Sequence, residues 1–144
     1  VNLDTLELQF HMIKDISPLK ELTNLRALAL GGNPVQDITP LSGMKDLDYL
    51  TLFNCNASDY SPLKNLTKLR ALQLGWSTFN DASVLQDLTN LDSLDLNYTA
   101  ITDVAPLANL TNLKTLTLEG DAISDYSPLK SIYPNLTNKD FDLP

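Results

Sequence analysis

The chain of 144 residues has few of the residue types on which most enzymes and metal sites depend. It contains one cysteine, Cys55, and one histidine, His11, which excludes an intrachain disulfide and any mechanism that needs two histidines. Only five glycines occur, and the P-loop, G-x-S-x-G, H-E-x-x-H and C-x-x-C motifs are all missing. The sequence therefore predicts a protein that is not an enzyme and that uses no cofactor and no catalytic metal.

Basic residues and long apolar runs are also scarce. Ten Lys and Arg stand against 18 Asp and Glu, and the resulting net charge of −8 disfavours binding to nucleic acid or anionic lipid. No apolar run approaches the roughly 18 residues of a membrane span, so we expect no membrane insertion by these residues. The chain begins with Val1 rather than methionine, and we expect a mature form, a proteolytic core or a fragment.

Leucine, in contrast, is abundant, with 30 of 144 residues, and its spacing is regular. One series recurs every 22 residues at Leu6, Leu28, Leu50, Leu72, Leu94 and Leu116. Parallel series run from Leu3, from Leu8 and from Leu19 with the same period. Internal periods of about 20 to 50 residues are typical of solenoids, in which each repeat buries its apolar face against its neighbours.

Each repeat divides into two halves with different patterns. The L-x-x-L-x-L half alternates apolar and polar residues, which predicts a half-buried strand stacked about 4.8 Å from the next one. The second half carries an Asp-x-Ser/Thr-Pro-Leu phrase, as at Asp15 to Leu19, where Ser17 is expected to cap a helical turn and Pro18 to begin it. About seven residues remain before the next strand, which favours a 3₁₀ turn or one to two turns of helix.

The predicted fold is therefore an α/β solenoid. We expect a right-handed leucine-rich-repeat coil with a concave parallel β-sheet and convex 3₁₀ or short helical turns. Residues 1–133 form six repeats of 22 residues. Residues 134–144, where the leucine register slips, are expected to form an irregular C-terminal end or a partial cap.

The phrases Asp15-Ile16-Ser17-Pro18-Leu19, Leu22-Thr23-Asn24-Leu25 and Leu110-Thr111-Asn112-Leu113 resemble the 22-residue repeats of the bacterial internalin family. The resemblance covers residues 1 to about 133. It implies a surface-attached or secreted protein that binds other proteins through its concave face. Internalins usually carry a ladder of asparagines, but here its positions hold His11, Asn33, Cys55, Ser77, Thr99 and Asp121. We expect His11 and Cys55 to point inward, as a hydrogen-bonded core histidine and a buried free thiol.

Six aspartates recur at one repeat position: Asp15, Asp37, Asp59, Asp81, Asp103 and Asp125. They could form a ladder of calcium ligands, or each could accept N–H groups in the turn before the helical segment. No glycine-rich calcium loop accompanies them, so the structural role is favoured.

The outward side chains of the strands supply the candidate ligand-binding surface. Tyr49, Phe53, Trp76 and Tyr98 lie on the third to fifth repeats, and exposed aromatic residues are typical of binding hot spots. Gly31 and Gly75 flank Phe53 on neighbouring strands and are expected to leave a hollow on each side of its ring. In the alternative interpretation, the curvature of the sheet packs the rings against one another. Polar candidates for the same surface are Gln73, Asp95 and Glu119.

Protein binding on this concave face is the favoured function, outside a bacterial cell or on its surface. Glu7, Asp95 and Glu119 lie on the outward ladders, which contain no Lys or Arg, so a partner with a basic surface is expected. Carbohydrate binding on the aromatic patch is an alternative, with a sugar ring stacked on Trp76 or Tyr49. A third possibility is a structural role, in which exposed ends of the solenoid stack on one another.

A charge ladder is predicted at the start of the strands. The residues there alternate in sign through Asp4, Arg26, Asp48, Arg70, Asp92 and Lys114. Adjacent strands are about 5 Å apart, so each arginine is expected to lie between two carboxylates.

Overall fold

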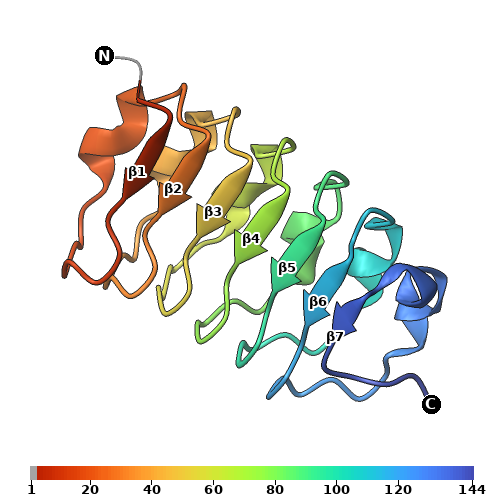
Figure 1. The fold of residues 1–144 in the computed structure, drawn as a ribbon. Helices are drawn as coiled ribbons and strands as arrows, with labels where there is room; N and C mark the ends of the chain where they lie inside the picture. The colour runs from red at the N-terminus through yellow and green to blue at the C-terminus, as the bar shows by residue number, and fades with distance from the viewer. Residues whose placement is uncertain (1–2) are drawn as a thin grey trace.

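The computed structural model describes residues 3–144 as a row of short parallel strands, followed along the chain by turns of 3₁₀ helix (Figure 1). Residues 1 and 2 of the first predicted repeat fall outside the described residues. The strands are β1 (Thr5–Glu7), β2 (Ala27–Ala29), β3 (Tyr49–Thr51), β4 (Ala71–Gln73), β5 (Ser93–Asp95), β6 (Thr115–Thr117) and β7 (Asn138–Lys139). They form one sheet in chain order, with every neighbouring pair parallel.

The register of the sheet follows the leucine period. Leu6 pairs with Leu28, Leu28 with Leu50, and the same offset continues to Leu116. Each strand is only three residues long at most, because one L-x-L step is all that the pattern devotes to the sheet. The predicted leucine-rich-repeat solenoid is confirmed, with a seventh strand added to the six that the intact repeats predict.

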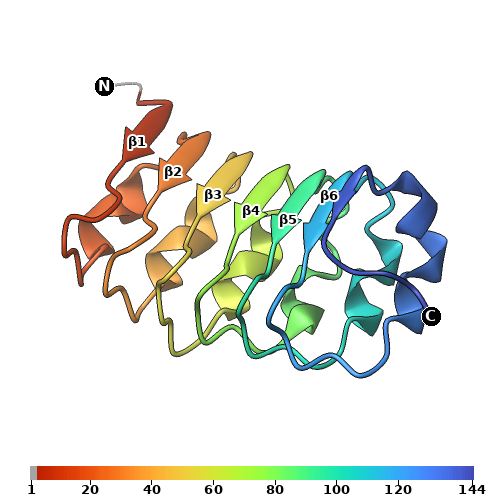
Figure 2. The same ribbon diagram turned by 60° about the horizontal axis from the view of Figure 1, so that its bottom comes forward.

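The second layer consists of 3₁₀ turns, which lie on the opposite side of the core from the strands (Figure 2). They are η1 (Ser17–Glu21), η2 (Thr39–Gly43), η3 (Ser61–Asn65), η4 (Ala82–Leu85), η5 (Ala105–Asn109), η6 (Ser127–Ser131) and η7 (Tyr133–Asn135). Proline is the second residue of most of them, one position later than the sequence predicted; its fixed φ suits the first helical turn and its missing N–H is not needed there.

The capping prediction was wrong about which side chain caps the turn. At η1 the Ser17 side chain makes no capping bond; instead its backbone N–H donates to Asp15 Oδ1 at 2.8 Å. The same bond recurs in all six repeats. In the other five, the backbone N–H two residues later donates to the carboxylate of Asp37, Asp59, Asp81, Asp103 or Asp125. A carboxylate two residues upstream reaches the free N–H in an Asx turn, so the serine hydroxyl is not required. The structural role predicted for these aspartates is confirmed.

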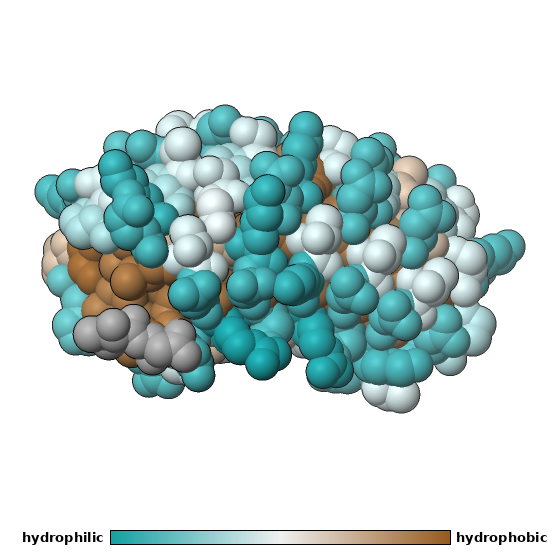
Figure 3. All heavy atoms as spheres, turned by 90° about the horizontal axis from the view of Figure 1, so that it is seen from above, coloured by the Kyte–Doolittle hydropathy of each residue, from teal (hydrophilic) through white to brown (hydrophobic). Residues whose placement is uncertain are grey.

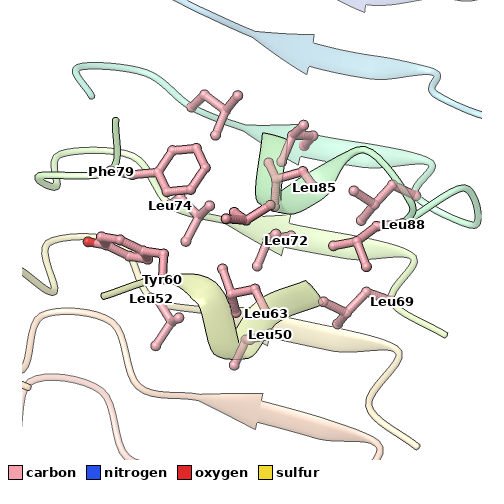
Figure 4. Packing of buried hydrophobic residues seen from close by; sticks show 14 of the residues in the cluster. Leu50, Leu52, Tyr60, Leu63, Leu69, Leu72, Leu74, Phe79, Leu85 and Leu88 are labelled. Atoms are coloured by element: carbon pink, nitrogen blue, oxygen red, sulfur yellow. The ribbon is translucent and has the colours of Figure 1, made fainter. Parts of the chain in front are cut away.

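The core lies between the two layers and consists mainly of the periodic leucines. Leu50, Leu52 and Leu63 are fully buried, and Figure 4 shows strand leucines facing those of the turns. Each such side chain contributes about 1.5–3 kcal/mol on burial. Tyr60 and Phe79 complete the layer with an edge-to-face contact at 5.1 Å between ring centroids.

The asparagine ladder survives fully at one position. Asn33 Nδ2 donates to the carbonyls of Leu8 and Leu30 at 2.6 and 2.7 Å, while its Oδ1 accepts the N–H groups of His11 and Ile13. The thiol of Cys55 is buried as predicted and makes one weak contact, with the Leu30 carbonyl at 3.4 Å. Fewer donors at the other positions of the ladder give fewer cross-repeat bonds.

The prediction for His11 was wrong. Its side chain is exposed, and Nδ1 lies 2.5 Å from the carbonyl oxygen of Gln9 on the same loop. The Leu8 carbonyl, which a ladder residue of this repeat would reach, accepts a hydrogen bond from Asn33 of the next repeat and none from the His11 ring. His11 is therefore a surface residue and not part of the core.

The two ends of the solenoid differ. At the C-terminal end, Asp140 accepts the backbone N–H groups of Leu118 and Glu119 at 2.8 and 3.1 Å, and Phe141 stacks on Tyr126. At the N-terminal end, apolar residues that are fully buried in later repeats are only partly buried; these are Leu3, Leu6, Leu8, Ile13, Leu19 and Leu22. Figure 3 shows the resulting apolar surface at this end of the molecule.

The edge at which the strands begin is hydrophilic along its length (Figure 3) and carries the alternating charges. Arg26 pairs with Asp48 at 2.6 Å, and Arg70 pairs with Asp92 at 2.7 Å. Each arginine therefore contacts the aspartate of the following repeat, and among residues 3–144 neither forms an ion pair with the preceding one. The prediction that each arginine lies between two carboxylates was therefore wrong, and the structure contains separate ion pairs. An arginine that contacts the aspartate of the following repeat is held away from the aspartate of the preceding one.

We expect Arg70→Asp to destabilise the protein by up to about 1 kcal/mol at low salt, since it replaces an exposed ion pair with repulsion between neighbouring aspartates. The loss should shrink as added salt screens the charges. Urea unfolding at low and high salt measures both effects. Lys130→Asp is the matched control, because Lys130 forms no ion pair within the described chain. Equal losses at both salt concentrations would contradict a role for the alternating charges.

Candidate binding surface

A row of residues directly after the strands shares an unusual backbone conformation. Its members are Phe10, Gly32, Asn54, Trp76, Tyr98 and Gly120, with φ between 52° and 80°. Glycine and asparagine adopt this left-handed region readily, but bulky residues do so at a cost of about 1–2 kcal/mol. Three aromatic residues are therefore held where the local backbone favours a glycine, and such strain is concentrated at functional sites.

The aromatic side chains of this surface form two separate ring pairs. Trp76 stacks on Tyr98, with centroids 4.1 Å apart and planes 24° from parallel. Phe10 contacts Phe53 at 5.5 Å with tilted rings. The predicted single patch is therefore divided. The alternative interpretation, in which the rings of the patch pack on one another, is correct for Trp76 and Tyr98, whereas Phe53 packs on Phe10, which was not part of the predicted patch. Trp76 nonetheless remains 61% exposed and Tyr98 39% exposed.

The hollows predicted beside Phe53 are filled. A Cβ built on Gly31 would lie 2.2 Å from the Phe53 ring, so the ring itself covers that glycine. Above Gly75 the space is taken by the Asp95 carboxylate and by the Asn97 carbonyl, about 3 Å from such a Cβ. Phe53 is half-buried as a result. The glycines make room for neighbouring side chains of the same chain, so the prediction of hollows for a ligand was wrong.

The remaining candidates from the sequence lie along the strands. Tyr49 on β3 is half-buried and lines a small hollow of about 300 Å³ with residues of β1 and β2, apart from the Trp76–Tyr98 pair. Gln73 on β4 and Asp95 on β5 are direct neighbours in the sheet register. Sequence reasoning placed Tyr49 in the same patch as Trp76, but the structure does not bring these two rings together as a pair.

The carboxylates gather beside the Trp76–Tyr98 pair. The Tyr98 hydroxyl donates to Glu119 Oε1 at 2.9 Å, and this hydrogen bond, followed by the charge of Glu119, raises the pKa of Tyr98. Asp95 Oδ1 accepts the Asn97 N–H and the Thr117 hydroxyl. Neither Asp95 nor Glu119 forms an ion pair within residues 3–144. The surface around the indole ring therefore carries negative charge that no neighbouring cation neutralises.

Asp121 occupies the ladder position behind this surface. Its Oδ1 accepts the backbone N–H and the hydroxyl of Thr99 at 2.7 and 2.9 Å, but its buried Oδ2 has no hydrogen-bond partner. Burial raises the pKa of Asp121 to about 6; the bonds from Thr99 oppose the shift, and the charges of Asp140 and Asp95 add to it. Asp121 therefore takes up a proton at a higher pH than an ordinary aspartate does, at a position where the ladder normally holds an amide.

Phe10 and Met12 were not among the candidates from the sequence, although they are 67% and 75% exposed. The exposure of Phe10 could have been predicted from the residues at the equivalent position of the other five repeats, which form one column along the solenoid. Glycine or asparagine at three of its six positions indicates a left-handed turn, and aromatic residues in the same column are then forced outward.

Within residues 3–144, no three His, Cys, Asp or Glu side chains are grouped as ligands for a metal ion. The described chain also contains no helix with the length and apolar character of a membrane span.

A larger open hollow of about 920 Å³ runs along the strand-start edge, where Arg26, Arg70 and Lys68 line it together with their aspartate partners. Because most of its charges are paired within the chain, this edge has less capacity to attract a partner than the acidic surface around Trp76.

Gly120 supports the Trp76–Tyr98 pair from the next repeat. It has φ of +80°, and a Cβ there would lie 2.4 Å from the Tyr98 ring. We expect Gly120→Ala to destabilise the protein by about 1–2 kcal/mol and to change the fluorescence of Trp76 as Tyr98 is displaced. Gly43→Ala is the control, since its nearest neighbour would be a Thr23 methyl at 3.9 Å and its φ is not positive. Identical melting curves and spectra for the two variants would contradict this support.

The chain is similar to known leucine-rich-repeat proteins. The family described as Leucine Rich repeats (2 copies) matches residues 1–43 and 89–138. The comparison with curated proteins gives no match. Among solved structures, an internalin (inlF) from Listeria monocytogenes is 35% identical with a TM-score of 0.88, over 97% of this chain and 41% of that one. An internalin C2 (inlC2) from the same species is 34% identical with a TM-score of 0.81, over 96% of this chain and 71% of that one.

Proposed function

We propose that this chain, which belongs to the bacterial leucine-rich-repeat proteins of the internalin type, is a non-catalytic module that binds a partner protein on its concave face. The observation that carries the proposal is Trp76, which is held in a strained left-handed conformation with most of its side chain exposed. Folding gains little from such a residue beyond its contact with Tyr98. A large rigid side chain in contact with solvent is, however, well suited to anchor a protein interface.

The proposed surface contains Tyr49, Phe53, Trp76, Tyr98, Gln73, Asp95 and Glu119. Its rings project from the strands and from the turns after them, which the short repeats hold at fixed spacing. A rigid presentation reduces the entropy that the protein loses on binding. Because Asp95 and Glu119 have no ion pair in the described chain, a partner with a basic surface is favoured.

We place the function outside a bacterial cell, with the protein either secreted or held on the cell surface. The support is the similarity to the two internalins and the fact that this chain spans only 41% of the first of them. Segments that attach the protein to a cell could therefore belong to a longer chain.

Carbohydrate binding on the same rings is the second candidate. A sugar could stack on the exposed face of Trp76, with hydrogen bonds to neighbours such as Asn54 and Gln73. Stacking of whole molecules through the apolar N-terminal end is a third candidate, supported by the partly buried leucines of the first repeat.

Affinity capture from host and envelope extracts, run beside a glycan array, separates these candidates. We expect a protein to be retained by the wild-type chain and lost with the double variant Trp76→Ala, Phe53→Ala. Retention of that protein by the double variant would place the binding site elsewhere, and a signal on the array alone would favour carbohydrate. Light scattering against concentration tests the third candidate, for which a monomer at every concentration is the negative result.

A further inference from the structure

The indole of Trp76 has two different faces. One face is covered by Tyr98 at 4.1 Å, whereas the side chain as a whole remains 61% exposed. In the preceding repeat the equivalent residue is Asn54, whose side chain is short, so no aromatic ring among residues 3–144 stacks on the second face. The free face is thus available to a flat group from outside the molecule.

The charge around this face is of one sign. Asp95 lies over Gly75, the residue before Trp76, with a carboxylate oxygen 3.1 Å from the position of a Cβ there, and Glu119 accepts the hydrogen bond of the Tyr98 hydroxyl. The four ion pairs of the described chain involve neither of them. Lys139, the cation on β7, instead lies over the Tyr133 ring and donates to the Leu136 carbonyl. An approaching cation therefore meets carboxylates whose charge is not neutralised.

We infer that the Trp76–Tyr98–Glu119 group is a docking site for an arginine side chain of the partner protein. The guanidinium would stack on the free face of Trp76, and its edge N–H groups would donate to the Asp95 carboxylate beside Gly75. The charge of Glu119, which lies beyond Tyr98, would attract it from a greater distance. This inference rests on the proposed function and specifies the chemistry of the partner.

Arginine fits the site better than lysine does. Its guanidinium is planar, so it continues the stack that Trp76 and Tyr98 begin, and it is weakly hydrated, so it gives up water readily. Its N–H groups lie in the plane of the stack and can reach a carboxylate at the edge of the ring. A sugar ring could also cover the indole face and donate a hydroxyl hydrogen bond to a carboxylate, but it has no positive charge for the carboxylates to attract.

Trp76 is the one tryptophan in the chain, so its fluorescence reports directly on this site. The probes are blocked pentapeptides with a single arginine, lysine or citrulline between glycines; citrulline matches arginine in shape but carries no charge. We expect the arginine peptide to change the fluorescence at millimolar concentration, and the citrulline peptide to need at least about ten times more. The lysine peptide should lie between them.

Two variants sharpen the test. Glu119→Gln should weaken the response to the arginine peptide about threefold to tenfold, whereas Glu21→Gln, which removes an equal charge on η1, should leave it unchanged. Equal responses to arginine and citrulline, no response to any peptide, or a Glu119→Gln variant that behaves as wild type would overturn the inference. Loss of the captured partner with Trp76→Asn, combined with any of these results, would leave the proposed function standing and reject only its arginine chemistry.

Discussion

Replacing Asp121 with asparagine is expected to stabilise the protein by about 1–3 kcal/mol at pH 7.5 and to have almost no effect at pH 4. Burial of the Asp121 carboxylate destabilises the folded protein because one of its oxygens has no hydrogen-bond partner. An amide at the same position can donate a hydrogen bond instead. Asn33 shows the geometry, since its amide bonds the carbonyls of Leu8 and Leu30. Urea unfolding followed by circular dichroism across this pH range measures the difference.

The direction of the pH dependence follows from the raised pKa. Asp121 has a pKa of about 6 in the folded state against a reference value of 3.8, so the folded protein holds the proton more tightly than the unfolded chain. The contribution of Asp121 to the free energy of unfolding is therefore greatest below pH 3.8, and this contribution is lost as the pH rises through about 6. Asparagine does not titrate, and its advantage should appear over the same interval.

Asp125→Asn is the matched control, four residues along the chain. Bonds from the side chain and backbone of Ser127 lower the pKa of Asp125, so its contribution to stability is present above its reference value and lost as pH falls. This variant should therefore show no gain at pH 7.5. If Asp121→Asn also shows none, or if its gain is the same at both pH values, the buried carboxylate of Asp121 does not destabilise the protein.

The sequence was sufficient for the fold because every level of the repeat agrees. The leucine period, the two-residue alternation and the proline positions all predict the same coil, and the register of β1 to β6 follows the 22-residue offset. The cap was assigned to Ser17 instead of Asp15 because both can accept a backbone N–H, and spacing alone does not distinguish them. The seventh strand was missed because its register contains one extra residue, with Thr115 paired to Asn138.

The binding surface was only partly predictable, because ring positions depend on contacts between repeats. Phe53 leans back over Gly31 and Tyr98 leans forward over Gly120, so two rings of one chain turn in opposite directions. No pattern within a single repeat determines this choice. The raised pKa of Asp121 was equally hidden, because it depends on burial and on Asp140 in the last segment of the chain.

Trp76→Asn should separate binding from folding more clearly than an alanine substitution does. Asparagine already occupies the same position at Asn54, with φ of 52°, and it tolerates the left-handed region. Relief of about 1–2 kcal/mol of backbone strain should offset the loss of stacking on Tyr98, which contributes about 0.5–1.5 kcal/mol. The melting temperature should therefore change little.

Binding, in contrast, should fall about thirtyfold or more when Trp76 becomes asparagine, since a hot-spot residue contributes at least about 2 kcal/mol to an interface. Titration of the captured partner against wild type and variant measures this loss, and thermal unfolding of the same samples measures stability. Thr78→Ala, two residues along the chain and also exposed, is the control and should bind as wild type does. A variant that melts well below wild type would show that Trp76 serves the fold, and unchanged affinity would exclude it from the interface.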